Sequence, residues 1–283
     1  MGGTVIDTMV AEASPVTALV APSGALPSCP VKSPATNTAS LADGSGQVVG
    51  WMLRADDCVA RVRPWPGEPG TVQLITLEQS APPARVIHRW TEELGRAGVR
   101  LIRTGALGPT IQPSYLECGF SVRQELSLLS HGLVGVRGSV VPSESLLLRR
   151  GRRTDLASLA LIDRSAFGPI WAMDVHGVAD ACQATPHHRL RIALGGSSVI
   201  GFAVSGRAGR SAYLQRLAVA PESQGNGVGR ALTVDALRWA RRQRCTSMMV
   251  NTHVENETAL ALYRSLGFQE LAYRLAVLER PLP

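Results

Sequence analysis

The chain has 283 residues, about the length of two average domains, and 45% of them are apolar, so the sequence can bury a core. Its 29 basic residues exceed the 22 acidic ones, but no run of five like charges occurs, and nucleic acid is not an expected partner. No stretch of 18 apolar residues occurs and the first basic residue is Lys32, which argues against a membrane span or a secretory signal. The five cysteines form no CxxC pair, so we expect reduced thiols, a cytoplasmic location and no metal site.

The first half of the chain predicts a small α/β domain after an irregular start. Residues 1–46 are rich in Ala, Ser, Thr, Pro and Gly, and they are either a loose arm or the edge of the first domain. Strands are predicted at 48–54, 58–62, 72–77 and 99–103, with a helix over 83–97 and an alternating run that ends at Leu129. Residues 132–142 resemble a linker.

The second half predicts a longer alternation of helices and strands, which indicates an α/β domain. Helices are predicted at 154–166, 175–182, 228–243 and 257–266, with His187-His188 at the end of a helix. Strands are predicted at 146–149, 189–194, 199–205, 212–219, 248–253 and 271–278.

The segment that carries chemistry joins the predicted strand 212–219 to the helix that follows. It reads Gln224-Gly225-Asn226-Gly227-Val228-Gly229-Arg230, and its glycines let successive backbone N–H groups point into one concavity. The positive end of the helix dipole favours an anion such as a diphosphate there. The dinucleotide fingerprint fails because Arg230 stands where its third glycine is required, and no GK[ST] follows for a nucleoside triphosphatase loop.

These residues resemble the GNAT acetyltransferase superfamily. Residues 224–229 match its Q/RxxGxG/A signature, and a second motif, N-x-x-A-x-x-L-Y-x-x-x-G-F, is matched by Asn256, Ala259, Leu262-Tyr263 and Gly267-Phe268. The resemblance implies acetyl-CoA as acyl donor and an amine as acceptor, either a small metabolite or a protein N-terminus.

The resemblance also implies roles for individual residues. The main chain of Leu217, Ala218 and Val219 would pair with the pantetheine arm, with the Val219 amide near the thioester carbonyl. The diphosphate would be held by Gln224, Gly225, Asn226, Gly227, Val228 and Gly229 with the N–H groups of Arg230 and Ala231. Asn256 would reach the pantetheine, and Tyr263 would protonate the departing thiolate. Phe167, Trp171 and Asp174 would shape the acceptor pocket.

Several of these residues have simpler structural interpretations, and the general base is not evident. Asn256 suits a helix N-cap, and Tyr263 lies on an apolar helix stripe and could be core. Where relatives often carry a glutamate, this chain has Tyr213 and Asn251, so His253 is the best local candidate, with Glu255 and Asp174 nearby. A positioned water, or an amine that arrives neutral, could also replace a base.

The two halves resemble each other weakly. A shift of 148 residues superimposes Tyr115 on Tyr263 and Gly119-Phe120 on Gly267-Phe268, while the first-half loop, residues 76–81, has no glycine. We therefore predict two tandem GNAT-like domains, each a mixed central sheet flanked by helices, similar to mycothiol synthase-like and ribosomal-protein N-acetyltransferase-like members. The first domain, 47–131, would be degenerate and 143–283 catalytic; an unrelated first α/β domain is the alternative.

The predicted function is an N-acetyltransferase that moves acetyl from acetyl-CoA to a primary amine by direct attack in a ternary complex. A non-catalytic acyl-CoA-binding regulator is the alternative, because no carboxylate base is evident.

Overall fold

The computed structural model describes residues 39–42, 48–77, 80–135 and 146–283. Most of the predicted irregular start, 1–46, and most of the predicted linker, 132–142, lie outside these residues, as do Glu78 and Gln79 of the glycine-free loop. The described chain divides into an amino-terminal unit, residues 39–124 with 276–283, and a carboxy-terminal unit, residues 125–275. The chain passes from one unit to the other within a strand on both occasions.

The amino-terminal unit is a mixed sheet with two helices. Its elements are β1 (Ala39–Ala42), β2 (Val48–Ala55), β3 (Cys58–Pro64), β4 (Thr71–Thr76), α1 (Ala84–Arg96), β5 (Leu101–Leu107), α2 (Gln112–Glu117) and the end of β12 (Gln269–Pro281). The strand order is β1-β2-β3-β4-β5-β12, and of the neighbouring pairs only β4 and β5 run parallel. The helical spacing predicted for α1 is confirmed, because Val86, Ile87, Trp90 and Leu94 are all buried.

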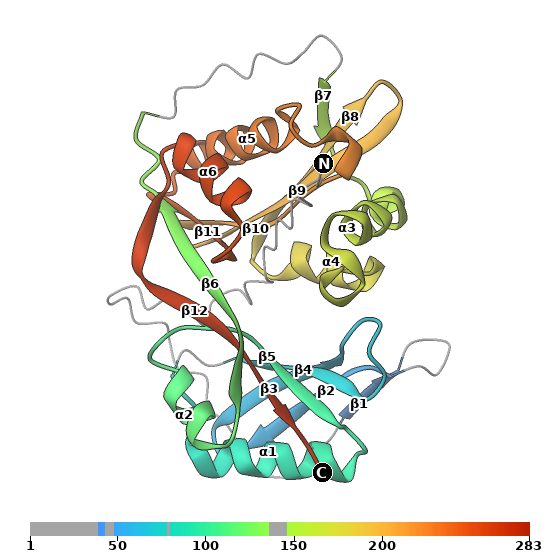
Figure 1. Ribbon diagram of the computed structural model, residues 1–283, viewed down its shortest axis with the longest axis vertical. Helices are drawn as coiled ribbons and strands as arrows, with labels where there is room; N and C mark the ends of the chain where they lie inside the picture. Colours follow the sequence, from blue (N-terminus) through green and yellow to red (C-terminus); the bar gives the residue numbers. More distant parts are fainter. Residues whose placement is uncertain (1–38, 43–47, 78–79, 136–145) are drawn as a thin grey trace. The chain divides into compact units, whose positions relative to one another are not determined.

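The carboxy-terminal unit has helices on both faces of its sheet (Figure 1). Its strands are the end of β6 (Ser121–His131), β7 (Leu146–Arg150), β8 (His187–Gly195), β9 (Ser198–Ala208), β10 (Ser211–Val219), β11 (Ser247–His253) and the start of β12. Its helices are η1 (Arg153–Asp155), α3 (Leu156–Trp171), α4 (Val175–Gln183), η2 (Pro221–Ser223), α5 (Val228–Arg242) and α6 (Glu257–Ser265). The strand order is β12-β6-β11-β10-β9-β8-β7.

Two separate cores result from the alternation of side chains along the strands of this unit. Ala203 and Leu217 face α5 and α6, whereas Phe202, Val204 and Ala218 face α3 and α4. Both faces of the central strands are covered, so residues 214–218 of β10 are all buried, the polar Gln215 and Arg216 included. The α/β prediction is confirmed.

Some expected boundaries are wrong. His187-His188 begins β8 instead of ending a helix, because α4 stops at Gln183. Helix α3 extends beyond residue 166 to Trp171, across a kink where Gly168 has a φ of 72° and Pro169 follows. None of the described helices is both long and apolar enough to cross a bilayer.

The two units share an order of elements. Each unit contains three strands, a helix, a strand, a helix and a final strand, in that order. These elements are β2, β3, β4, α1, β5, α2 and β6 in the first series and β8, β9, β10, α5, β11, α6 and β12 in the second. The parallel pair lies at the same place in both series, between β4 and β5 or between β10 and β11. The Tyr115 and Phe120 rings lie 5.1 Å apart at the end of α2, and the Tyr263 and Phe268 rings lie 5.5 Å apart at the end of α6. This match supports the predicted repeat; loss of a cofactor loop from the first copy stays a prediction.

Candidate functional site

The site begins where the two central strands of the carboxy-terminal unit separate. Parallel pairing of β10 with β11 extends only from Ser211–Ser247 to Tyr213–Met249. Beyond that point β10 pairs with β9 alone, and a bulge at Gln215 interrupts this pairing between Leu214 and Arg216. A bulge bends its strand and increases its twist, so it turns β10 away from β11. Beyond Tyr213, the edge of β10 that faces β11 is therefore unpaired, although β10 lies in the middle of the sheet.

The backbone of β10 faces this gap with free hydrogen-bonding capacity. Ala220 donates its N–H to the Ile200 carbonyl of β9 at 2.9 Å. In an antiparallel ladder the N–H and C=O of successive residues point to alternate sides, so those of Leu217 and Val219 point away from β9, toward the gap. The Val219 carbonyl accepts a 3.0 Å hydrogen bond from the Gln224 side chain, which fixes the start of the glycine-rich loop.

That loop leads into an uncapped helix terminus. Gly225 and Gly227 have φ values of 77° and 78°, a left-handed conformation that glycine adopts without strain. Gly227 is the N-cap of α5, no side chain caps the helix, and the first helical bond runs from the Ala231 N–H to the Gly227 carbonyl at 2.9 Å. The N–H groups of the first turn therefore have no helical acceptor, and the site fits an anion such as a diphosphate.

Arg230 lies at this terminus with an exposed side chain. Its Nη1 donates to the Ser265 hydroxyl at 2.9 Å, which ties the first turn of α5 to the end of α6. An added Cβ at Gly229 would lie 3.5 Å from Leu262 of α6, an ordinary van der Waals distance, so the start of α5 packs close to α6. The two motifs seen in the sequence are therefore adjacent in space.

Tyr263 is buried with an unused hydroxyl. Its side chain is fully enclosed in the core that holds Leu217 and Val228, and its Oη has no hydrogen-bond partner among the residues described. A buried hydroxyl without a protein partner is costly, and it can donate to a ligand that reaches it. Burial raises the pKa of the Tyr263 phenol, so it stays protonated at neutral pH and is available as an acid.

Asn256 caps α6, as the structural interpretation predicted. Its Oδ1 accepts the Ala259 N–H at 3.1 Å, and the residue is buried. This bond satisfies one of the helix's unused donors. It occupies Oδ1 and leaves the role of the amide nitrogen toward a cofactor untested.

Sequence reasoning missed Gln215 and undervalued Asn251. Each lies two residues past the last paired positions, Tyr213 and Met249, so both flank the point where the strands separate. Both are buried, and Oδ1 of Asn251 and both amide atoms of Gln215 lack a protein partner among the described residues. The Gln215 amide lies over Gly206 of β9, and each of the two unpartnered carbonyl oxygens can accept an N–H donor. Only the bulge brings Gln215 here, and no local sequence signal predicts it.

His253 is poorly arranged for the base role that the sequence suggested. Its Nδ1 accepts the Glu255 backbone N–H at 3.1 Å. In a neutral imidazole the nitrogen that accepts is unprotonated, so the proton lies on Nε2 and the free nitrogen is a donor. His253 in this orientation presents an N–H to the site instead of a lone pair.

The three residues expected to shape the acceptor pocket have structural contacts of their own. Phe167 is buried beneath the Arg216 guanidinium, whose carbon lies 3.5 Å from the ring centre. The Trp171 carbonyl accepts a 2.9 Å bond from Arg216. Asp174 is exposed and caps α4, accepting the Gly177 N–H at 2.7 Å.

A buried ion pair joins β10 to α3 beside the bulge. Arg216 donates to both carboxylate oxygens of Asp163, at 2.8 and 2.6 Å, and both side chains are almost fully buried. Asp163 also accepts the Met173 N–H at 2.6 Å, which holds the segment after the α3 kink. This pair fixes the strand that borders the gap, and the sequence did not predict it.

The buried cysteines of the described chain are not activated as nucleophiles, and its potential metal ligands are not grouped together. Burial raises the pKa of the Cys182 thiol to about 11, and burial also raises the pKa of the Cys245 thiol, so both remain protonated and poor nucleophiles. Cys118, Cys182 and Cys245 are free thiols, and no described group of three or more His, Cys, Asp or Glu could hold a metal ion.

Together, a split parallel strand pair beside a helix terminus with unused N–H donors gives this α/β domain a geometry that fits an extended, phosphate-bearing ligand. Residues 156–268 match the acetyltransferase (GNAT) family, and the chain therefore contains a GNAT domain, as the motifs predicted.

Two known proteins resemble part of the chain. The chain is 35% identical over 95 residues to N-alpha-acetyltransferase RimI of Mycobacterium tuberculosis, covering 32% of this chain and 58% of that protein. It is 45% identical over 53 residues to mycothiol acetyltransferase of Acidothermus cellulolyticus, covering 19% of this chain and 16% of that protein. The match thus spans less than two thirds of either relative.

Solved structures share the fold at low identity. A tandem GNAT protein from the clavulanic acid biosynthesis pathway aligns over 82% of both chains with a TM-score of 0.59 and 12% identity. A GCN5-related N-acetyltransferase from Kribbella flavida aligns over 82% of this chain and 90% of its own, with a TM-score of 0.55 and 15% identity.

Proposed function

We propose that this protein is an acetyl-CoA-dependent N-acetyltransferase. The observation that carries the proposal is the gap between β10 and β11, which places an open strand edge, an uncapped glycine-rich helix terminus and the buried Tyr263 hydroxyl within one GNAT domain. The open N–H and C=O groups of Leu217 and the N–H of Val219 would pair with the amide-containing arm of the cosubstrate, as an added strand does. The loop 224–229 and the first turn of α5 would hold its diphosphate.

Acetyl-CoA supplies an activated acyl group, and this chain supplies orientation and protons. The Val219 N–H points into the gap and would donate to the thioester oxygen as negative charge develops there. The amine nitrogen would form its bond to the acyl carbon while the carbon–sulfur bond breaks. Tyr263 would give its phenolic proton to the departing thiolate.

The amine would be held by carbonyl oxygens. Oε1 of Gln215 and Oδ1 of Asn251 are buried, lack protein partners in the described chain and flank the point where the strands separate. Neither amide takes up a proton at neutral pH, so the proton that the amine loses would pass to water. Either a small aminated metabolite or a protein N-terminus fits this chemistry, and the two named relatives illustrate both kinds of acceptor.

Turnover tests the proposal. Purified protein is incubated with acetyl-CoA and a panel of primary amines and N-terminal peptides, and the release of CoA thiol and the mass of acetylated product are recorded. We expect transfer to at least one acceptor and a kcat about 10²–10⁴-fold lower in Tyr263→Phe, the usual contribution of a general acid. Tyr115→Phe removes another buried phenol, in the amino-terminal unit, and should not change kcat. Equal rates for Tyr263→Phe and wild type would remove the acid assignment.

A non-catalytic acyl-CoA-binding protein is the second candidate. It is favoured by the absence of a carboxylate at the strand positions of Tyr213 and Asn251, within the part of β10 and β11 that the structure describes. Tight binding of acetyl-CoA with no thiol release across the whole panel would establish it.

A further inference from the structure

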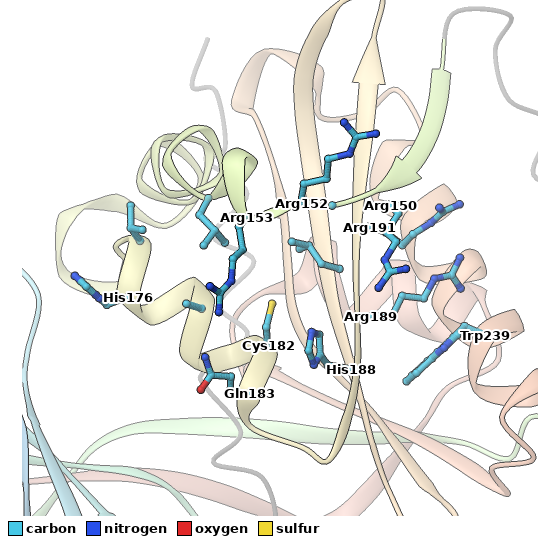
Figure 2. Close-up of a pocket in the computed structure, with 15 residues that line it drawn as sticks. Arg150, Arg152, Arg153, His176, Cys182, Gln183, His188, Arg189, Arg191 and Trp239 are labelled. Atoms are coloured by element: carbon cyan, nitrogen blue, oxygen red, sulfur yellow. The ribbon is translucent and has the colours of Figure 1, made fainter.

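A second charged site lies outside the region assigned to acetyl-CoA. A cavity of about 1050 Å³ surrounds the edge of β8 in the carboxy-terminal unit, where β7 stops and the chain turns toward α3 (Figure 2). Five arginines line it and no carboxylate does: Arg150, Arg152, Arg153, Arg189 and Arg191. This volume is at the upper end of the range for small-molecule sites.

The arginines are divided between the two faces of β8. Residues alternate along a strand, so Arg189 and Arg191 share the face toward α5, while Leu190 packs in the core under α3 and α4. Figure 2 shows Arg189 and Arg191 on the side of Trp239, with Arg153 and Cys182 on the other side of the strand. A ligand with two separated negative charges can pair with both groups of arginines at once.

The carboxylates close to the cavity do not neutralise it. Asp235 of α5 is the ion-pair partner of both Arg189 and Arg191, at 3.0 Å from each, so one carboxylate faces two guanidinium groups. On the other side Asp155 is held by Arg149 at 2.7 Å, and no described carboxylate forms an ion pair with Arg152 or Arg153.

Arg189 in particular has an unmet hydrogen-bond donor. Its Nη1 is buried and has no partner among the described residues, although the side chain contacts Asp235 through Nη2. Burial, with added repulsion from Arg191 and Arg242, lowers the pKa of the Arg189 guanidinium despite the attraction of Asp235. A buried, unpartnered donor on a charged group is costly, and an anion in the cavity would satisfy it.

This cavity is separate from the glycine-rich loop. Trp239 lies near the carboxyl end of α5, whereas the loop precedes its first residue, Val228. At about 1.5 Å per residue the two positions are about 16 Å apart along the helix axis. One diphosphate cannot occupy both sites.

We infer that the cavity around β8 binds a ligand bearing two or more phosphate groups, at a site distinct from that of acetyl-CoA. Planar guanidinium groups pair bidentately with phosphate oxygens, which explains why arginines line it. The phosphates could belong to a small polyphosphate or to the backbone of single-stranded RNA, and the charge pattern of the sequence alone did not predict either. The inference does not depend on the proposed acetyl transfer.

Calorimetry with inorganic tripolyphosphate and with orthophosphate tests the inference on the full chain. We expect tripolyphosphate to bind at least tenfold more tightly, because only it can contact both faces of β8. Arg189→Gln and Arg153→Gln should each weaken the binding of tripolyphosphate by roughly tenfold to a hundredfold, the usual effect of losing a hydrogen bond to a charged group. Arg153 is exposed, so its variant remains informative if Arg189→Gln does not fold.

Two control variants distinguish binding in this cavity from binding to the general basic surface or to the glycine-rich loop. Arg164→Gln removes an exposed arginine of α3 that does not line the cavity, and should not change the affinity. Gly227→Glu, which disrupts the glycine-rich loop, should also keep tripolyphosphate binding. The inference is overturned if Arg164→Gln weakens binding as much as Arg153→Gln, if Gly227→Glu abolishes it, or if orthophosphate binds equally well.

Fluorescence anisotropy with a short labelled single-stranded RNA identifies the source of the phosphates. The site is assigned to nucleic acid if RNA binds more tightly than tripolyphosphate and if Arg153→Gln reduces the slope of log binding constant against log salt concentration by about one. Binding of tripolyphosphate without RNA assigns it to a small ligand. If neither binds, the inference is wrong.

Discussion

Replacing Gly227 by glutamate tests the assignment of the glycine-rich loop most directly. The residue has a φ of 78°, and a Cβ added there would meet no atom within 4 Å, so the side chain fits but the backbone is strained. Left-handed backbone costs a non-glycine residue about 1–2 kcal/mol. A carboxylate at a helix N-cap recovers about 0.3–1 kcal/mol of this through the helix dipole. We therefore expect a folded protein with slightly lower stability.

The effect on acetyl-CoA binding should be much larger. With an effective dielectric constant of about 20, two like charges at about 4 Å repel by about 4 kcal/mol, which is nearly a thousandfold in the dissociation constant. We expect calorimetry with acetyl-CoA to show a loss of at least a hundredfold in Gly227→Glu. Gly227→Ala, which carries the strain without the charge, should lose less than about tenfold.

Gly209→Glu is the matched control for stability. Gly209 lies in the exposed turn between β9 and β10, has a φ of 57° and would also receive a Cβ without contact. The two glutamate variants should have similar midpoints of thermal unfolding, but only Gly227→Glu should lose affinity for acetyl-CoA. If Gly227→Glu binds acetyl-CoA as wild type does, the loop does not hold the diphosphate and the reasoning fails.

Three further predictions concern stability. Asp163→Asn leaves the Arg216 charge buried without its partner and should lower the free energy of unfolding in urea by about 3–5 kcal/mol; a loss below about 1 kcal/mol would contradict a buried pair. Asn256→Ala removes the α6 cap and should lower the free energy of unfolding by about 0.5–2 kcal/mol, whereas Asn256→Asp keeps a capping oxygen and should keep stability. If both variants lose acetyl-CoA affinity, the loss comes from a ligand contact of the Asn256 amide and not from the cap. Hydrogen bonds from Arg149 lower the pKa of Asp155, so its stabilisation is present above the unfolded pKa and is lost as pH falls through the folded one. Urea midpoints of Asp155→Asn should therefore fall less steeply below about pH 4 than those of wild type, and parallel profiles would refute the contribution.

The local features of the site could be predicted because short-range rules produce them. Left-handed glycines before a helix, an asparagine cap and a glycine after α6 each depend on backbone geometry within a few residues, and each is found where the motifs indicated. The GNAT resemblance rested on the same segments and is confirmed by the family match over residues 156–268. Roles that need a ligand, such as that of Tyr263 as acid, stay predictions.

Features that join distant segments could not be predicted. The Arg216–Asp163 pair connects residues 53 positions apart, and sequence spacing cannot show that one salt bridge orders β10 and α3 together. The position of Gln215 beside the end of the β10–β11 pairing depends on how β10 pairs with β9, a strand formed by another segment of the chain. Each outcome depends on a register or a rotamer that the packed core selects.

The sequence by itself determined the α/β class, the glycine-rich helix start and the motif around α6, because these follow from hydrophobic period and local backbone preference. Tertiary structure alone decided where β10 leaves β11, which buried amides flank that point and how five arginines gather around the edge of β8. Strand register, a bulge and the packing of separate elements control those outcomes, and none of the three is encoded within a short window of sequence.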